Sequence, residues 1–168
     1  MRAIMVASVL VLAIALPTAW AQALSPEVTA KGKAAVEALE ALQSVLSVGV
    51  NYADYQRRLG DTKIITDQFM RVAPEEALAR KVINEAQEAY KQALWAWKWK
   101  IEQHESSIDV RAVFPMGDET IKRIFTCDAP ELIVDRDLGK FINADALIQA
   151  CWRKADKNTA QARRMLWH

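Results

Sequence analysis

The chain has 168 residues, with 22 Lys and Arg against 21 Asp and Glu, which gives a formal net charge of +1 at pH 7. This length is sufficient for one domain with a hydrophobic core. The balanced charge lacks the basic excess on which nucleic-acid binding depends, so we expect no nucleic-acid partner. Only five Gly and five Pro occur, and this composition favours helices over strands.

Residues 1–21 have the pattern of a bacterial secretory signal peptide. Arg2 supplies a positive charge, an apolar run extends over residues 4–16, and small residues precede the bond after Ala21. The apolar run is shorter than the roughly 20 residues that a membrane-spanning helix needs. We therefore expect signal peptidase to cleave after Ala21, with Ala23 as the alternative.

Cleavage after Ala21 leaves residues 22–168, which we expect to form a single soluble helical domain in the periplasm or outside the cell. Because Arg2 is the only charged residue removed, the mature chain has 21 basic and 21 acidic residues and a formal net charge of zero. None of its later apolar segments is long enough to span a membrane.

The first helix of the mature chain has a clear start at Ser25, a good N-cap, with Pro26 in the first helical position. Apolar residues then recur at steps of three and four as far as Leu59. Gly60 follows and is a natural stop for the helix, whereas Gly49 weakens its middle.

A short second helix is expected after Gly60, with Asp61 or Thr62 as its cap. It should end before Pro74, because proline disfavours helical geometry in the residue that precedes it. The alternative is that the first two helices form one long rod with a kink at Gly60.

The third helix is predicted to begin with Pro74 in its first turn and to end near Gln103 or His104. Residues 105–142 are the least regular part of the chain. Their apolar triplet Leu132–Val134 is compatible with a strand or with buried irregular chain. A single strand without a convincing partner does not make a sheet, so we expect none.

The last helix is predicted to begin at Asn143, which is a good N-cap, with Asp145 in the first turn. Apolar positions at helical spacing continue to Leu166. Asp118 is a candidate cap for one more short helix within the irregular segment.

Cys127 and Cys151 are the two cysteines of the chain. In an oxidising compartment an isolated pair normally forms a disulfide, which would pin the irregular segment to the last helix. We therefore expect an all-α fold: an antiparallel bundle of three long helices and one or two short ones, with a disulfide-pinned segment before the last helix.

No catalytic or metal-binding constellation is recognisable. His104 lies between Glu102 and Glu105, but neighbouring positions of a helix point about 100° apart and cannot converge on one ion. The chain has no motif for metal binding, phosphate binding or nucleophilic catalysis. We therefore expect a protein that is not an enzyme and has no metal or cofactor.

A carrier of an apolar cofactor is the competing hypothesis. Haem held between helices needs axial ligands such as His or Met, for which His104 with Met70 or Met116 are the candidates. No covalent haem-attachment motif is present.

The stretch NYADYQRRLGDTK gathers hydrogen-bonding groups, among them Tyr52, Tyr55, Arg58 and Lys63. One interpretation is a surface that binds a polar or anionic small molecule. The structural interpretation, which we favour, is that the tyrosines are half-buried core residues and the arginines cover the helix surface.

Three tryptophans alternate in the stretch ALWAWKWKI. On a helix, Trp97 falls on the core face, whereas Trp95 and Trp99 lie one above the other on the opposite side. This pair is either covered by residues 105–142 or the last helix, a surface for self-association or a protein partner, or a membrane-surface patch.

The expected function is therefore that of an exported, non-enzymatic helical domain that binds a protein or a small ligand. The candidate surface consists of Trp95, Trp99, Tyr52, Tyr55, Arg58 and Lys63.

Overall fold

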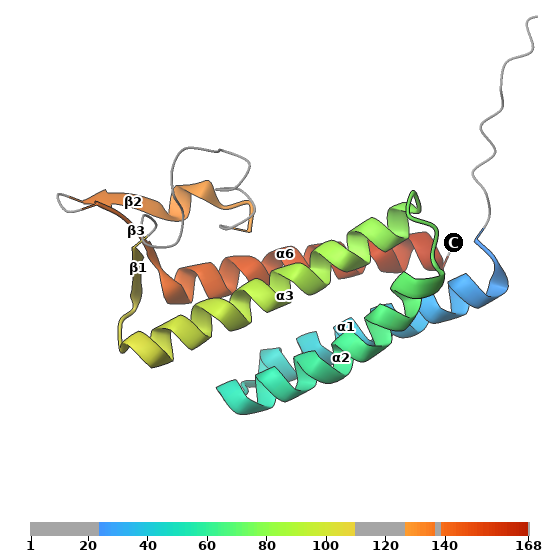
Figure 1. The fold of residues 1–168 in the computed structure, drawn as a ribbon, viewed down its shortest axis with the longest axis horizontal. Coiled ribbons are helices and arrows are strands. Elements are labelled where there is room, and N and C mark those ends of the chain that lie inside the picture. Colours follow the sequence, from blue (N-terminus) through green and yellow to red (C-terminus); the bar gives the residue numbers. More distant parts are fainter. Residues whose placement is uncertain (1–23, 110–126, 137–138, 168) are drawn as a thin grey trace, which may run out of the picture.

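Four long helices form a bundle in the computed structural model, which describes residues 24–109, 127–136 and 139–167. The helices are α1 (Pro26–Val48), α2 (Tyr52–Val72), α3 (Leu78–Gln103) and α6 (Ala144–Leu166). In Figure 1, α3 lies alongside α6 and α1 lies beside α2, so that two helix pairs pack on each other. The expectation of an all-α antiparallel bundle is confirmed.

The break between the first two helices differs from the prediction. α1 ends at Val48 because Gly49 adopts φ +93°, a conformation that side chains disfavour. Asn51 then caps α2 by accepting a hydrogen bond of 2.9 Å from the backbone N–H of Asp54. Gly60 lies inside α2, so both the predicted stop at Gly60 and the single kinked rod are wrong, and the second helix is long.

The first and last helices begin directly after Ser25 and Asn143, the two residues predicted to be their N-caps. Ser25 Oγ accepts from the backbone N–H of Val28 at 3.3 Å, and Asn143 Oδ1 accepts from that of Ala146 at 2.9 Å. The start of α3 was predicted too early, because the residues from Pro74 to Ala77 form a separate turn closed by a backbone hydrogen bond of 3.1 Å.

A small antiparallel sheet lies at the end of the bundle where α3 ends and α6 begins (Figure 1). Its strands are β1 (Ser107–Asp109), β2 (Ile133–Arg136) and β3 (Gly139–Asn143), in the order β1-β3-β2, with a 3-10 turn, η1 (Pro130–Leu132), before β2. The expectation of no sheet is wrong, because β3 pairs Ile142 with both Ile108 and Ile133. The short helix expected from Asp118 lies outside the described residues.

The disulfide between Cys127 and Cys151 is confirmed, with 5.0 Å between the two Cα atoms. Beside it, Lys154 Nζ lies 2.8 Å from Asp128 Oδ2. Cys127 and Asp128 both have positive φ, 52° and 65°. The disulfide and the ion pair together hold the chain before β2 against α6.

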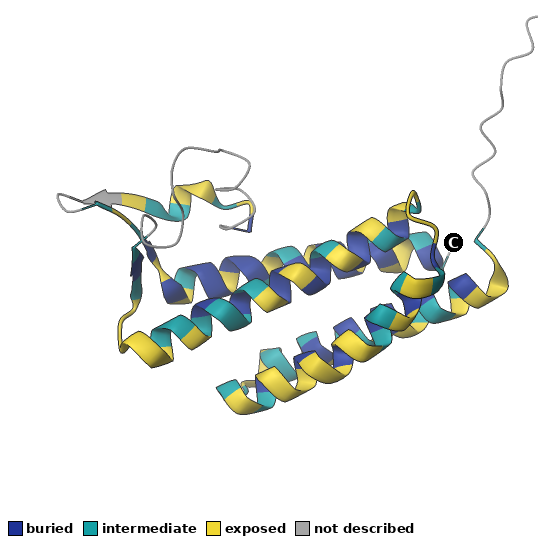
Figure 2. Ribbon diagram, in the orientation of Figure 1, coloured by how far each residue is buried: buried dark blue, intermediate teal, exposed yellow. Residues whose placement is uncertain are grey.

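The core lies between the helices, whose buried faces point toward one another in Figure 2. The helices approach closely at Gly32 of α1, where a Cβ atom would lie 2.9 Å from Leu166 and 3.1 Å from Phe69. The end of α6 therefore packs directly on α1. Within the described ranges, no helix combines the length and apolar character that crossing a membrane requires.

Candidate binding groove

Four aromatic rings from three helices form a cluster at one end of the core. Tyr55 of α2 lies 5.8 Å from Trp97 of α3 and 5.9 Å from Trp152 of α6, measured between ring centroids. Trp97 also contacts Trp152 and Tyr52, both at 6.1 Å. Trp97, which the helical period assigned to the core, is half-buried and packs against it.

Hydrogen bonds join Tyr55 of this cluster to Trp152 and to the neighbouring Tyr90. The Tyr55 hydroxyl donates to the backbone carbonyl of Tyr90 at 2.8 Å and accepts from Trp152 Nε1 at 3.2 Å. The Tyr90 hydroxyl donates to Asp156 Oδ1 at 2.9 Å. Burial raises the pKa of both phenols, so they remain neutral hydrogen-bonding groups at physiological pH.

Tyr55 is a core residue, as the structural interpretation of the NYADYQRRLGDTK stretch expects, but it is fully buried where half-buried tyrosines were expected; Tyr52 is half-buried. Arg58 and Lys63 are both exposed. They are five positions apart on α2 and therefore point about 140° apart around the helix axis. The structure thus separates the expected group into a core residue, Tyr55, and side chains on two different surfaces.

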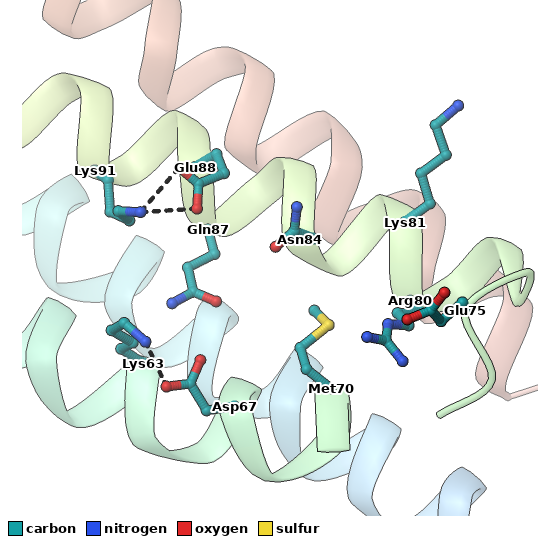
Figure 3. A pocket seen from close by; sticks show the side chains of 10 residues that line it. All are labelled: Lys63, Asp67, Met70, Glu75, Arg80, Lys81, Asn84, Gln87, Glu88 and Lys91. Atoms are coloured by element: carbon teal, nitrogen blue, oxygen red, sulfur yellow. Dashed lines mark hydrogen bonds and ion pairs between the residues drawn. The ribbon is translucent and has the colours of Figure 1, made fainter. Parts of the chain in front are cut away.

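Lys63 is one of ten residues that line a groove between α2 and α3, with a volume of about 570 Å³. Figure 3 shows these side chains on the two helices and on the turn that joins them, with the Lys81 side chain extending away from the others. The lining comprises four basic, three acidic and three uncharged residues: Lys63, Arg80, Lys81, Lys91, Asp67, Glu75, Glu88, Met70, Asn84 and Gln87.

The floor of the groove is polar. Thr66 of α2 is fully buried and Gln87 of α3 is 3% exposed. The Thr66 hydroxyl donates to Gln87 Oε1 at 2.7 Å, and Figure 3 shows Gln87 extending from α3 toward α2, between the ion pair on α3 and the ion pair on α2. The seam between the two helices is therefore closed at this level by a hydrogen bond.

The walls of the groove carry one ion pair on each helix. Lys63 pairs with Asp67 on α2, and Lys91 Nζ lies 2.8 Å from Glu88 Oε1 on α3. All four side chains are between 44% and 55% exposed, so they are accessible from solvent. Charges at spacings of three and four are visible in the sequence, but nothing in it indicates that these two pairs face each other.

The pair Trp95 and Trp99 stacks as the helical spacing predicted, with 5.8 Å between ring centroids. Both rings are half-buried and pack against core residues. Trp99 Nε1 is buried and has no acceptor in the described structure. The segment expected to cover this pair, residues 105–142, includes 110–126 and 137–138, which lie outside the described residues.

The structure does not bring the candidate haem ligands together among the residues that it describes. His104 is exposed at the end of α3, Met70 lines the groove, and Met116 lies outside the described residues. Among the residues that the structure describes, no three His, Cys, Asp or Glu side chains are grouped so that they could hold a metal ion.

Comparison of the chain with protein-family models, with curated proteins and with solved structures finds no match. Any functional assignment therefore depends on the groove and the surfaces described above.

Proposed function

We propose that the protein is an exported, non-enzymatic helical domain that binds a small polar ligand in the groove between α2 and α3. The observation that supports it is Gln87, which lines the open groove although it is only 3% exposed and is held by a hydrogen bond to the fully buried Thr66. Burying polar groups is costly, and a seam that serves only stability is better closed by apolar side chains. A polar floor suits a groove that receives polar atoms.

The dimensions of the groove agree with this proposal. Small-molecule sites typically have volumes of about 300–1,000 Å³, and this groove has about 570 Å³. Nine of its ten lining side chains come from two helices that pack on the core, and Glu75 comes from the turn that joins them, so the backbone of both walls is in place without a ligand. Rigid walls reduce the entropy lost on binding.

Export is part of the proposal. The disulfide between Cys127 and Cys151 suits an oxidising compartment, and residues 1–21 have the pattern of a signal peptide. Recovery of a mature chain beginning at residue 22 or 24 from the periplasm or medium would support export. Recovery of the full-length chain from the cytoplasm alone would contradict it.

A ligand screen tests the function. Thermal unfolding of the mature chain is followed with amino acids, sugars, polyamines, carboxylates and phosphates, since a ligand that binds only the folded state raises Tm. Asn84→Tyr fills the groove, and Gln149→Tyr places the same ring on an exposed position of α6. We expect at least one compound to stabilise the Gln149→Tyr variant but not the Asn84→Tyr variant. If no compound shows this dependence on Asn84, the proposal is wrong.

A carrier of an apolar cofactor is the second candidate. In the described core, the rings of Tyr55, Trp97 and Trp152 fill the space between three helices by contacting one another, which favours the groove over the interior. An absorbance scan of protein purified from its natural source decides between them, because a Soret band would identify a haem carrier.

A partner surface at Trp95 and Trp99 stays a prediction. Acrylamide quenching of the wild type is compared with that of Trp95→Phe and Trp99→Phe. A strongly quenched component that both substitutions reduce would indicate an accessible surface, and unchanged quenching would indicate that the pair is covered.

A further inference from the structure

We infer that the groove between α2 and α3 recognises a zwitterion, a ligand with an ammonium and a carboxylate group a few bonds apart, such as a free amino acid or short peptide. The inference depends on the proposed function and names the chemical class of its ligand. It is drawn from the signs and positions of the charges in the groove.

Each wall of the groove presents both signs of charge at the same level. On α2 the Lys63 ammonium lies beside the Asp67 carboxylate, and on α3 the Lys91 ammonium lies beside the Glu88 carboxylate. Figure 3 shows the α2 pair below and the α3 pair above the Gln87 amide. A ligand between the walls is therefore close to two cations and two anions at once.

This arrangement disfavours ligands with a single charge. An anion would gain from Lys63 and Lys91 but would be repelled by Asp67 and Glu88, and a cation would meet the opposite combination. With four basic and three acidic side chains, the lining as a whole has almost no net charge. A zwitterion can place its carboxylate near the lysines and its ammonium near the acids, so that all contacts are attractive.

The existing ion pairs do not prevent such a ligand from binding. Their side chains are 44–55% exposed, and exposed ion pairs contribute little to stability because water screens them. Replacing one partner of such a pair by a charged group of the ligand therefore costs little free energy. A ligand that spans the groove contacts charges on both helices at once, which neither intrahelical pair does.

The floor of the groove suits the part of such a ligand that lies between its charges. The Gln87 amide carries both donors and an acceptor, and only its Oε1 is engaged in a hydrogen bond with a described residue, Thr66. A primary amide can pair with the peptide group of a dipeptide, which has one donor and one acceptor. Met70 provides an apolar contact in the same groove.

Titration calorimetry of the mature chain with three matched compounds tests the inference. The compounds are the free dipeptide alanyl-leucine, its N-acetyl form, which is an anion, and its C-terminal amide, which is a cation. We expect the free dipeptide to bind and each derivative to bind about tenfold more weakly or not at all, because each loses one charged contact.

Two substitutions on α2, one at Lys63 and one at Arg58, test where the ligand binds. Lys63→Met should weaken binding of the free dipeptide about tenfold, because it removes one charged contact while retaining the length of the side chain. Arg58→Met is the matched control, since Arg58 is exposed on the same helix but does not line the groove. Thermal unfolding of both variants verifies that they fold.

The outcomes separate the two proposals. Binding of the N-acetyl form as tightly as the free dipeptide, with loss in Lys63→Met, shows an anion site and overturns the zwitterion inference alone. If neither the dipeptide nor any amino acid binds but a singly charged or uncharged compound binds in a manner that depends on Asn84, the inference is again wrong and the groove remains a binding site. Absence of any Asn84-dependent ligand overturns both.

Discussion

Tyr90 of α3 and Asp156 of α6 are joined by a hydrogen bond of 2.9 Å in which the Tyr90 hydroxyl is the donor. The two helices pack along much of their length, and this bond is a polar contact within that interface. Burial raises the pKa of Asp156, while hydrogen bonds from Tyr90 and Gln43 oppose the increase. Both hydrogen bonds therefore favour the ionised form of the carboxylate.

Tyr90→Phe should lower the free energy of unfolding by about 1.5 kcal/mol at pH 7, because the half-buried carboxylate loses a donor. Urea unfolding of the variant and the wild type measures this change. Tyr52→Phe is the control: the described structure shows no hydrogen bond to its hydroxyl, so this variant should unfold at the wild-type midpoint. Equal losses in the two variants would contradict the role of the Tyr90 hydroxyl.

Asp156→Asn should become more stable relative to the wild type as the pH rises. The pKa of Asp156 in the folded protein lies above its ordinary value of 3.8. The stability that this group contributes is therefore complete below pH 3.8 and is lost as the pH rises through the folded-state pKa. The asparagine does not titrate, so it avoids that loss.

Urea midpoints of Asp156→Asn and the wild type between pH 3 and pH 7 provide the measurement. The difference between the two proteins should change in favour of the variant above about pH 4. A difference that stays constant over this range would show that ionisation of Asp156 does not affect stability.

One substitution, Gly to Ala, should have opposite effects at two positions. Gly60 is exposed within α2, and a Cβ atom there meets no atom within 4 Å, so Gly60→Ala should stabilise the protein by about 1 kcal/mol. Gly49 has φ +93°, so Gly49→Ala should destabilise it by about 1 kcal/mol or more. Thermal unfolding measures both. Stability changes of the same sign in the two variants would contradict a break between α1 and α2 at Gly49.

Loss of the disulfide should lower the free energy of unfolding by about 3 kcal/mol, because the bond constrains the unfolded chain between residues 24 positions apart. Cys127→Ser combined with Cys151→Ser is compared with the wild type in urea, with and without dithiothreitol. The reductant should weaken the wild type and leave the double variant unchanged. If complete reduction left the urea unfolding of the wild type unchanged, the disulfide would have no role in stability.

The sequence predicts best those features that depend on neighbouring residues. Ser25 and Asn143 were identified as caps because capping involves a side chain and a backbone N–H only three positions away. The contact of Trp95 with Trp99 follows from helical spacing in the same way. The two glycines were confused because Gly49 and Gly60 both interrupt a helical pattern, and only the Asn51 cap distinguishes them.

Features that join distant segments could not be predicted. The triplet that contains Ile133 is a plausible strand, but its partner β3 is recognisable only when Ile142 is seen to pair on both sides. The groove is lined by residues of two helices, among them Lys63 of α2 and Gln87 of α3. Residues so far apart in the sequence form no local pattern that would predict it. The sequence therefore singled out Lys63 but grouped it with Tyr55 instead of the side chains that it faces.

The order of the helices has a consequence for biogenesis. α1, α2 and α3 are joined by the short connections 49–51 and 73–77, whereas residues 104–143 separate α3 from α6. Cys151 lies in α6, so its disulfide with Cys127 can form only after most of the chain has been synthesised. A chain whose synthesis stops before residue 151 presents a lone Cys127 thiol. Oxidation thus distinguishes finished molecules from truncated ones.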